Sequence, residues 1–374
     1  MYTSRLIISL PRLCENYRLA AAMVPDAEPI CVVKANAYGH GAVECTEALL
    51  NAGAEWFAVA NIKEAEQLRE ALGFGFELMI LGHTPAECAE KLVKLNITQT
   101  VYSAEYANAL ADSLAVSGVS GRIRAHLKID SGMNRLGFEA SEKGVADALG
   151  VCSNTAFDIL GAFSHFARAD EPEDESAVSA TEGQARRFIS FTDELGSCGY
   201  EIPFRHICAS SGIINYPKFA LDGVRPGIIL YGIKPSDSMP DMRVHGFRHV
   251  MSLSTRISHL HTVRAGERVS YGGTWTAERD TLVATMPIGY GDGFIRAYRG
   301  CGVMIRGVRC PIIGRICMDQ CIADVSGVEG VKLFDEVGVW TDENPVDLFA
   351  RAASTIPYES VCIIGGRSER VYIK

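Results

Sequence analysis

Short apolar runs alternate with helical patterns through the first two-thirds of the chain. The runs predicted as strands are residues 30–35, 56–60, 78–81, 98–102, 124–129, 159–164, 204–209 and 227–231. Between them lie helical patterns such as residues 42–52, 63–71, 104–116 and 182–195, with Ser103 and Thr181 placed to cap the last two. Strands that alternate with helices pair in parallel through right-handed crossovers. Eight such units predict a closed (β/α)₈ barrel, and a doubly wound open sheet is the alternative.

The pattern changes after about Pro235, where a polar loop leads into period-2 segments separated by tight turns. Residues 303–305 and 310–316 are typical of a hairpin. A chain of 374 residues is also too long for one small core. We therefore predict a barrel domain over residues 1–240, followed by a mostly β domain over residues 241–374.

Composition narrows the class of protein. Hydrophobic residues make up 48% and charged residues 22%, which is typical of a soluble globular protein. A net charge of −9 makes nucleic acid a poor partner. No apolar run reaches the roughly 20 residues of a membrane helix, and the start of the chain shows no secretory cleavage pattern. The twelve cysteines form no C-x-x-C pair, so we expect neither metal nor disulfides, and a cytoplasmic setting.

The segment with the clearest chemistry is residues 32–41, Val-Val-Lys-Ala-Asn-Ala-Tyr-Gly-His-Gly. Its lysine, Lys34, ends the first predicted strand, and a barrel builds its active site at the C-terminal ends of its strands. Partial desolvation there lowers the pKa of a lysine and frees its amine as a nucleophile. On this pattern alone, a lysine at the surface end of a strand is an equal alternative.

These ten residues resemble the cofactor-binding segment of the alanine racemase family. The resemblance covers nearly the whole chain, because further motifs of the family recur in order. It implies a (β/α)₈ barrel followed by a β domain, pyridoxal phosphate (PLP) as cofactor, and a homodimer with shared active sites. Lys34 then matches the lysine that binds PLP covalently, and Tyr38 matches a tyrosine that contacts its phosphate.

Residues 126–137 resemble the family segment that approaches the phenolic oxygen of PLP. The family arginine that binds this oxygen, and that also meets the substrate, matches Arg135. Lys128 matches a lysine that is carbamylated in several members. A carbamate is an anion that would orient the arginine, whereas an unmodified lysine would crowd it with like charge. An ordinary Lys128 in contact with Asp130 is the alternative.

Two further strand ends carry residues that the resemblance places around the PLP ring. His165 matches a histidine that stacks near the ring, and Asp170 matches an acidic residue at the substrate entrance. Arg225 matches the arginine that faces the pyridine nitrogen, with His206 behind it. An arginine does not give up its proton, so the ring becomes a weaker electron sink, which favours simple reprotonation. As a bare feature, Arg225 is equally a surface cation.

Loops after the seventh and eighth strands often bind phosphate in barrels. Here Ser211 and the backbone N–H groups of Gly227 and Ile228 are the predicted phosphate ligands. Ser210 departs from the family, which usually has asparagine at this position, and its hydroxyl can still donate a hydrogen bond.

The predicted β domain carries the second base by resemblance. A racemase removes a proton from one face of Cα and returns one to the other, which two bases achieve directly. Tyr271 matches the base for the L face, entering from the partner subunit, with Lys34 serving the D face. Tyr290 and Arg315 match gate or supporting residues. Met318 matches the backbone N–H that meets the substrate carboxylate. Tyr358 matches a phenol that contacts the PLP phosphate and limits the substrate side chain to about a methyl group.

The resemblance leaves substrate choice open, because an apolar pocket discriminates weakly against one extra hydroxyl. A serine or broad-specificity small amino-acid racemase is therefore an alternative. A PLP decarboxylase would need a catalytic cysteine segment that is not found. A non-catalytic PLP-binding barrel protein would lack residues 241–374. A dehydrogenase would need G-x-G-x-x-G after its first strand.

Overall fold

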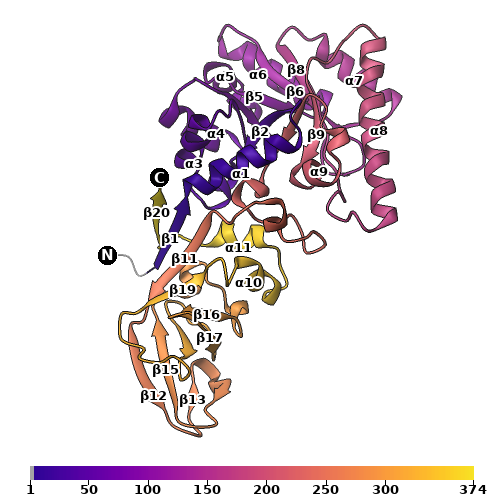
Figure 1. Cartoon of the computed structure of the whole chain (residues 1–374). Coiled ribbons are helices and arrows are strands. Elements are labelled where there is room, and N and C mark those ends of the chain that lie inside the picture. The colour runs from indigo at the N-terminus through magenta and orange to yellow at the C-terminus, as the bar shows by residue number, and fades with distance from the viewer. Residues whose placement is uncertain (1–3) are drawn as a thin grey trace. The chain divides into compact units, whose positions relative to one another are not determined.

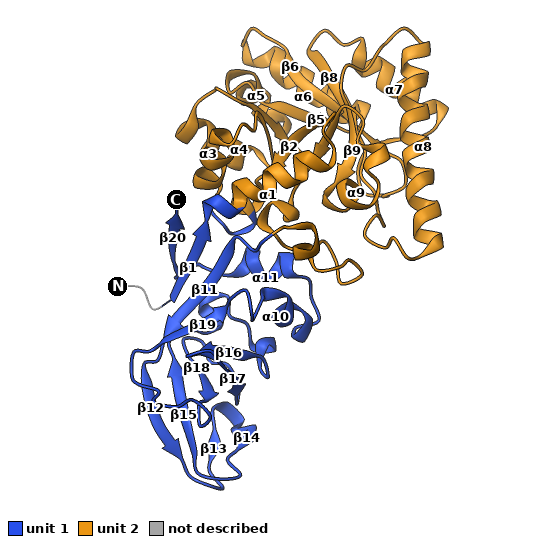
Figure 2. Cartoon of the chain, in the orientation of Figure 1, with its two compact units in different colours: residues 1–12, 38–41, 248–374 blue, residues 13–37, 42–247 orange. Residues whose placement is uncertain are grey.

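The computed structural model describes residues 4–374, which form two compact units (Figure 2). The barrel unit comprises residues 13–37 and 42–247. The β unit comprises residues 248–374, residues 38–41 and the described part of residues 1–12. Neither unit is one continuous segment of the chain.

Eight strands of the barrel unit form a closed parallel sheet. They are β2 (Glu28–Val32), β3 (Trp56–Val59), β4 (Glu77–Ile80), β5 (Thr98–Val101), β6 (Ile123–Asp130), β8 (Phe157–Phe163), β9 (Arg205–Ala209) and β10 (Gly223–Arg225). Pairing of β5 with β6 and of β10 with β2 closes the ring. This is the (β/α)₈ barrel that the sequence predicts, and the open-sheet alternative is excluded.

The local sequence explains these elements. β3 and β4 are buried at every position after the first, which is typical of parallel strands covered on both faces. Helices α3 (Ala42–Asn51), α4 (Ile62–Leu72) and α6 (Ala104–Ser117) lie around the sheet in Figure 1. The predicted cap of α6 is confirmed, because the Ser103 hydroxyl accepts a hydrogen bond from the backbone N–H of Tyr106.

The prediction of the eighth strand over residues 227–231 is wrong. The strand is β10, which ends at Arg225, and Ile228–Tyr231 form a 3-10 helix (η3) instead. Pro226, which has no N–H, follows the strand directly. All four residues of η3 are buried, and a short buried apolar run shows no periodicity that separates a strand from a helix.

The predicted start of the last barrel helix is also wrong. α8 runs from Glu175 to Ser197, and Asp174 is its cap, accepting hydrogen bonds from the N–H groups of Ser176 and Ala177. Thr181 is a buried residue inside this helix. Asp174 and Glu175, at the end of an acidic stretch, thus contribute the cap and first turn, where negative charge favours a helix.

The β unit is built on one sheet of nine strands, in the order β12-β15-β18-β17-β16-β19-β11-β1-β20. These are β1 (Ser4–Ser9), β11 (Met251–Arg256), β12 (His259–Val263), β15 (Thr281–Met286), β16 (Gly302–Ile305), β17 (Val308–Ile313), β18 (Cys321–Asp324), β19 (Glu336–Trp340) and β20 (Glu369–Ile373). The predicted hairpin is confirmed, because β16 and β17 pair in antiparallel register. Unexpectedly, β1 lies between β11 and β20.

Three observations apply to residues 4–374. No helix in this range is both long and apolar enough to span a membrane. Within it, no three histidine, cysteine or acidic side chains gather as they would to hold a metal ion. All twelve cysteines are free thiols.

Candidate active site

Lys34 lies just beyond the end of β2 and begins a turn of unusual handedness. Residues 35–38 all have φ between 50° and 55°, in the left-handed region. A left-handed turn costs non-glycine residues roughly 1–2 kcal/mol each. Backbone strain of this kind persists only where surrounding contacts impose it, and it gathers at functional sites.

Two side chains hold this turn, one from outside it and one from within it. The Glu64 carboxylate accepts one hydrogen bond from the N–H of Ala35 at 2.9 Å and another from the N–H of Ala60 at 2.8 Å. It therefore ties the residue after Lys34 to the end of the neighbouring strand β3. The Asn36 side chain accepts from the N–H of Ala42 at 2.8 Å. No local pattern in the sequence indicates the role of Glu64.

The chain then passes into the β unit, where Gly39 contacts α11 (Pro357–Ile363) closely. A Cβ on Gly39 would lie 2.0 Å from the carbonyl oxygen of Val361, and its φ of 84° also requires glycine. Arg370 donates a hydrogen bond to the Gly39 carbonyl at 2.9 Å. The ring of Tyr38 meets that of Tyr358 edge-on, with centroids 6.0 Å apart. Two of the predicted phosphate contacts therefore lie side by side.

Arg225 ends β10 and is only 3% exposed, so the interpretation as a surface cation is wrong. Its guanidinium donates to the carbonyls of Ser164 at 2.7 Å and Ile207 at 2.9 Å. Its other partners are Nδ1 of His206 at 2.5 Å and Nδ1 of His165 at 3.3 Å. Burial lowers the pKa of Arg225 to about 10. It is therefore a buried cation at neutral pH, and no ion pair links it to a carboxylate among residues 4–374.

Lys128 is buried on β6 close to this cation. Its Nζ donates to the Ile129 carbonyl at 2.9 Å and lies 5.2 Å from the centre of the Phe163 ring. Burial, followed by repulsion from Arg225, lowers the pKa of Lys128 to about 7. A substantial fraction of this side chain is therefore a neutral amine near neutral pH.

The turn after β6 presents Arg135. The Asp130 carboxylate accepts hydrogen bonds from the N–H groups of Gly132, Asn134 and Arg135 at 2.9–3.0 Å. Gly137 fits against this turn because a Cβ would lie 2.5 Å from the nitrogen of Asp130. Asp130 thus fixes the backbone of the turn from which the exposed Arg135 side chain projects.

Ser210 joins the two loops predicted to bind phosphate. Its buried hydroxyl accepts from the N–H of Gly227 at 3.1 Å, which links the loop after β9 to the loop after β10. Ser211 follows in the short helix α9 (Ser210–Asn215) and is partly exposed. Ile228 is the first residue of η3, where N–H groups have no acceptor within the helix.

The loop after β8 carries Asp170, which is partly exposed. Its carbonyl accepts a hydrogen bond from the Ser236 hydroxyl at 3.3 Å. Arg168 pairs with both Glu171 and Asp174, at 2.5 Å and 2.9 Å, and so fastens this loop to the start of α8.

In the β unit, Tyr271 stands on an exposed turn. It is 68% exposed and lies in a short 3-10 helix, η5 (Tyr271–Gly273). The Ser270 hydroxyl donates to the Arg315 carbonyl at 2.6 Å. A Cβ on Gly272 would lie 2.8 Å from the Arg315 guanidinium, so the Arg315 side chain packs against this turn.

Tyr290 and Met318 lie on two segments of the β unit that are bound together. The N–H of Tyr290 donates to the Cys317 carbonyl at 3.0 Å. Arg367 bridges the segments by donating to Asp292 at 2.9 Å and Asp319 at 2.8 Å. No local pattern in the sequence indicates this ion-pair bridge, because its members lie far apart along the chain.

The predicted residues therefore fall into two groups. Those of the barrel unit lie on strands or in the segments that follow them, and are Lys34, Lys128, Arg135, His165, Asp170, His206, Ser211, Arg225, Gly227 and Ile228. Those of the β unit are Tyr38, Tyr271, Tyr290, Arg315, Met318 and Tyr358.

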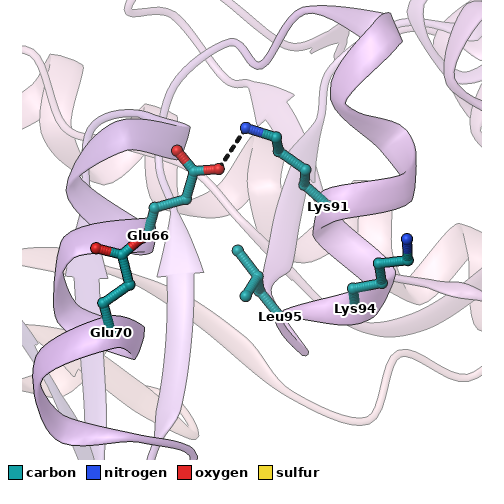
Figure 3. Close-up of a pocket in the computed structure, with 5 residues that line it drawn as sticks. All are labelled: Glu66, Glu70, Lys91, Lys94 and Leu95. Atoms are coloured by element: carbon teal, nitrogen blue, oxygen red, sulfur yellow. Dashed lines mark hydrogen bonds and ion pairs between the residues drawn. The ribbon is translucent and has the colours of Figure 1, made fainter.

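A shallow hollow elsewhere on the barrel unit contains none of these residues. It lies between α4 and α5 (Ala89–Lys94) and is shown in Figure 3. Lys91 pairs with Glu66 across it at 2.5 Å. Its charged lining is accounted for by exposed ion pairs, which contribute little to stability.

Comparison with known proteins identifies the family. Residues 8–235 match the N-terminal domain of alanine racemase, and residues 250–372 match its C-terminal domain. The chain belongs to the alanine racemase family. It is 38% identical to an alanine racemase of Desulforamulus reducens, over 98% of both chains.

Solved structures agree with this assignment. An alanine racemase of Clostridium difficile 630 superposes with a TM-score of 0.92 at 35% identity, covering 100% of this chain and 96% of that one. The alanine racemase of Bartonella henselae, solved with covalently bound pyridoxal phosphate, gives 0.88 at 27% identity, with both chains fully covered.

The lowered pKa of Lys128 predicts a pH dependence of stability. Free lysine has a pKa of about 10.4, so between pH 7 and 10 the unfolded chain holds a proton that the folded chain lacks. Stability should therefore rise with pH through this window, by at most about 1.4 kcal/mol per pH unit from this group. Replacing Lys128→Met should remove that contribution. Urea unfolding of both proteins at pH 7, 8 and 9 measures it, and parallel curves would contradict the assignment.

Proposed function

We propose that this protein interconverts L-alanine and D-alanine, with pyridoxal phosphate held at the C-terminal ends of the barrel strands. The observation that carries the proposal is the pairing of two features at these ends. Lys34 stands on a strained turn after β2, and Arg225 is buried after β10 without a carboxylate partner among the described residues. Membership of the alanine racemase family supports the same reaction.

The donor set fits pyridoxal phosphate. Lys34 supplies an amine for its aldehyde carbon, and Ser211 with the N–H of Ile228 supplies donors for its phosphate. Arg225 supplies a guanidinium toward the ring nitrogen, supported by His206. When bound, the cofactor withdraws electrons from the substrate and so makes the Cα proton acidic. Arg225 remains charged at neutral pH and does not give up its proton, so the ring nitrogen would stay unprotonated and that withdrawal would be limited.

Proton transfer at Cα is assigned to two residues on opposite faces. The Lys34 amine takes or returns the proton on the D face, and the partner subunit's Tyr271 does so on the L face, within a homodimer. The exposed position of Tyr271, on a turn that Arg315 packs against, supports a role at a second copy of the chain. Arg135 and the N–H of Met318 are assigned to the substrate, with Tyr290 and Asp170 at its entrance.

Alanine is the proposed substrate because Tyr358 is bulky and already packed. Its ring meets that of Tyr38 edge-on at 6.0 Å, in the same unit. Tyr38 and His165 complete the proposed cofactor contacts. The N–H of Gly227, predicted to bind the phosphate, donates to the Ser210 hydroxyl instead, so Gly227 is left out of the proposed donor set. A side chain larger than a methyl group would have to displace a phenol that is fixed by its neighbour.

Replacing Lys34→Ala tests the cofactor site. The variant should no longer hold the cofactor covalently, so borohydride treatment should leave no pyridoxyl label on the chain. Racemisation should fall by about 10³-fold, since a positioned base is lost. Lys63→Ala, at an exposed lysine of α4, is the matched control and should keep both properties. Full activity in Lys34→Ala would refute the proposed function.

Replacing Tyr271→Phe tests the second base separately. In D₂O, exchange of the Cα proton of L-alanine should slow by about 10²–10⁴-fold, whereas exchange from D-alanine should persist through Lys34. Proton NMR of both enantiomers measures the two rates. Tyr200→Phe, in the barrel unit, serves as control. Equal exchange from both enantiomers in Tyr271→Phe would contradict the two-base assignment.

We also propose that Lys128 is carbamylated. Its pKa of about 7 provides the neutral amine that reacts with CO₂, forming an N–C bond and releasing one proton. The product is an anion beside the positive charges of Arg135 and Arg225, which it would offset. Protein equilibrated with ¹³C-bicarbonate at pH 8 should show a carbamate carbon resonance that Lys63→Met keeps and Lys128→Met loses. No such resonance in the wild type would exclude the modification.

A further inference from the structure

A line of hydrogen-bonded side chains crosses the interior of the barrel behind Arg225. Arg225 contacts Nδ1 of His206 at 2.5 Å, and Nε2 of His206 contacts Nδ1 of His126 at 2.9 Å. The three residues come from β10, β9 and β6. Both histidines are completely buried, and Arg225 is 3% exposed. His126 is therefore connected to Arg225 without touching it.

The chemistry of Arg225 fixes every proton along this line. A guanidinium only donates, so Nδ1 of His206 must accept. A neutral imidazole that accepts at Nδ1 carries its proton on Nε2, and His206 therefore donates to Nδ1 of His126. By the same rule, His126 carries its own proton on Nε2. That N–H is buried and has no hydrogen-bond partner within residues 4–374.

Both imidazoles are neutral, and this fixes the direction of donation from Arg225 to His206 and from His206 to His126. Burial, together with nearby positive charge that includes Arg225, lowers the pKa of His126 to about 3. The same causes hold the pKa of His206 well below its usual value. Doubly protonated histidines would place two donors against each other, so the line depends on this neutrality.

The surroundings leave the His126 ring little freedom. A Cβ on Gly161 would lie 2.9 Å from Cε1 and Nε2 of the ring, so the absence of a side chain there makes room for it. The His206 ring stacks on Phe163, with centroids 4.9 Å apart and planes 6° apart. Rotation of either ring to choose another partner would therefore require repacking the barrel interior.

We infer that His126 is a positioning residue for the racemase reaction: by accepting the Nε2 proton of His206, it locks the His206 tautomer that receives Arg225. Without that acceptor, His206 can move its proton to Nδ1, which then faces an Arg225 N–H at 2.5 Å. Two donors at this distance repel, and Arg225 must shift. The inference rests on the proposed function, in which Arg225 faces the cofactor ring.

Two near-isosteric variants separate hydrogen bonding from packing. His126→Asn places an amide oxygen near the position of Nδ1 and keeps an acceptor for His206. His126→Leu has a similar size and shape but no acceptor. Both leave a similar space and remove the Nε2–H of His126. The asparagine amide adds N–H donors of its own, which can only reduce its recovery. A difference between them therefore reports the hydrogen bond to His206.

Steady-state kinetics of the two holoenzymes gives the first measurement. In His126→Leu, kcat should fall by about tenfold or more, equivalent to one hydrogen bond to a charged group. KM should change much less, because no substrate contact is altered. His126→Asn should recover most of kcat. Equal losses in both variants would overturn the inference, because a purely structural role would respond to the lost ring and not to the acceptor.

Nitrogen-15 NMR of histidine-labelled wild-type holoenzyme gives a second measurement, which reads the tautomers in the unaltered protein. His206 and His126 should both appear as neutral rings protonated at Nε2, and they should remain so at pH 6. The His126 signals are assigned by their loss in His126→Asn. A His206 ring protonated at Nδ1, or at both nitrogens, would overturn the inference. This outcome is independent of the Lys34→Ala test, so failure of one proposal is distinguishable from failure of the other.

Discussion

The buried charge of Arg225 is the constraint around which the barrel interior is arranged. A cation taken out of water is costly unless it is paired or fully hydrogen-bonded. Here the compensation comes from neutral groups, namely the carbonyl oxygens of Ser164 and Ile207 and the Nδ1 atoms of two histidines. Burial, and after it the same positive charge, keeps the pKa values of those histidines low and lowers the pKa of Lys128. The guanidinium thus reinforces what burial imposes on its neighbours.

The strained turn after Lys34 is stabilised by hydrogen bonds, some of which come from a distant part of the sequence. Four left-handed residues follow the lysine directly, and the compensating hydrogen bonds come from Glu64 and Asn36. The Glu64 carboxylate accepts hydrogen bonds from the backbone N–H of Ala35, which follows β2, and of Ala60, which follows β3. The lysine is therefore positioned by the main chain around it.

The success of sequence-based prediction depended on how local each signal is. The Ser103 cap and the β16–β17 hairpin are short-range patterns and were confirmed. The strand over residues 227–231 and the cap at Thr181 failed, because burial and an upstream acidic cap override the local pattern. Glu64 and His126 act through partners that only the fold brings near, so no window of sequence could indicate them. The candidate site residues came from family motifs, and their roles remain predictions.

The position of β1 has a consequence for how the chain folds during synthesis. β1 is an interior strand of the nine-stranded sheet, paired with β11 on one side and β20 on the other. Its partner Glu369 is separated from Arg5 by 364 residues. At roughly 5–20 residues per second, β1 waits on the order of 20–70 seconds on the ribosome for that partner. The barrel strands emerge entirely within this interval, so the barrel can close first, while β1 remains a strand without a sheet.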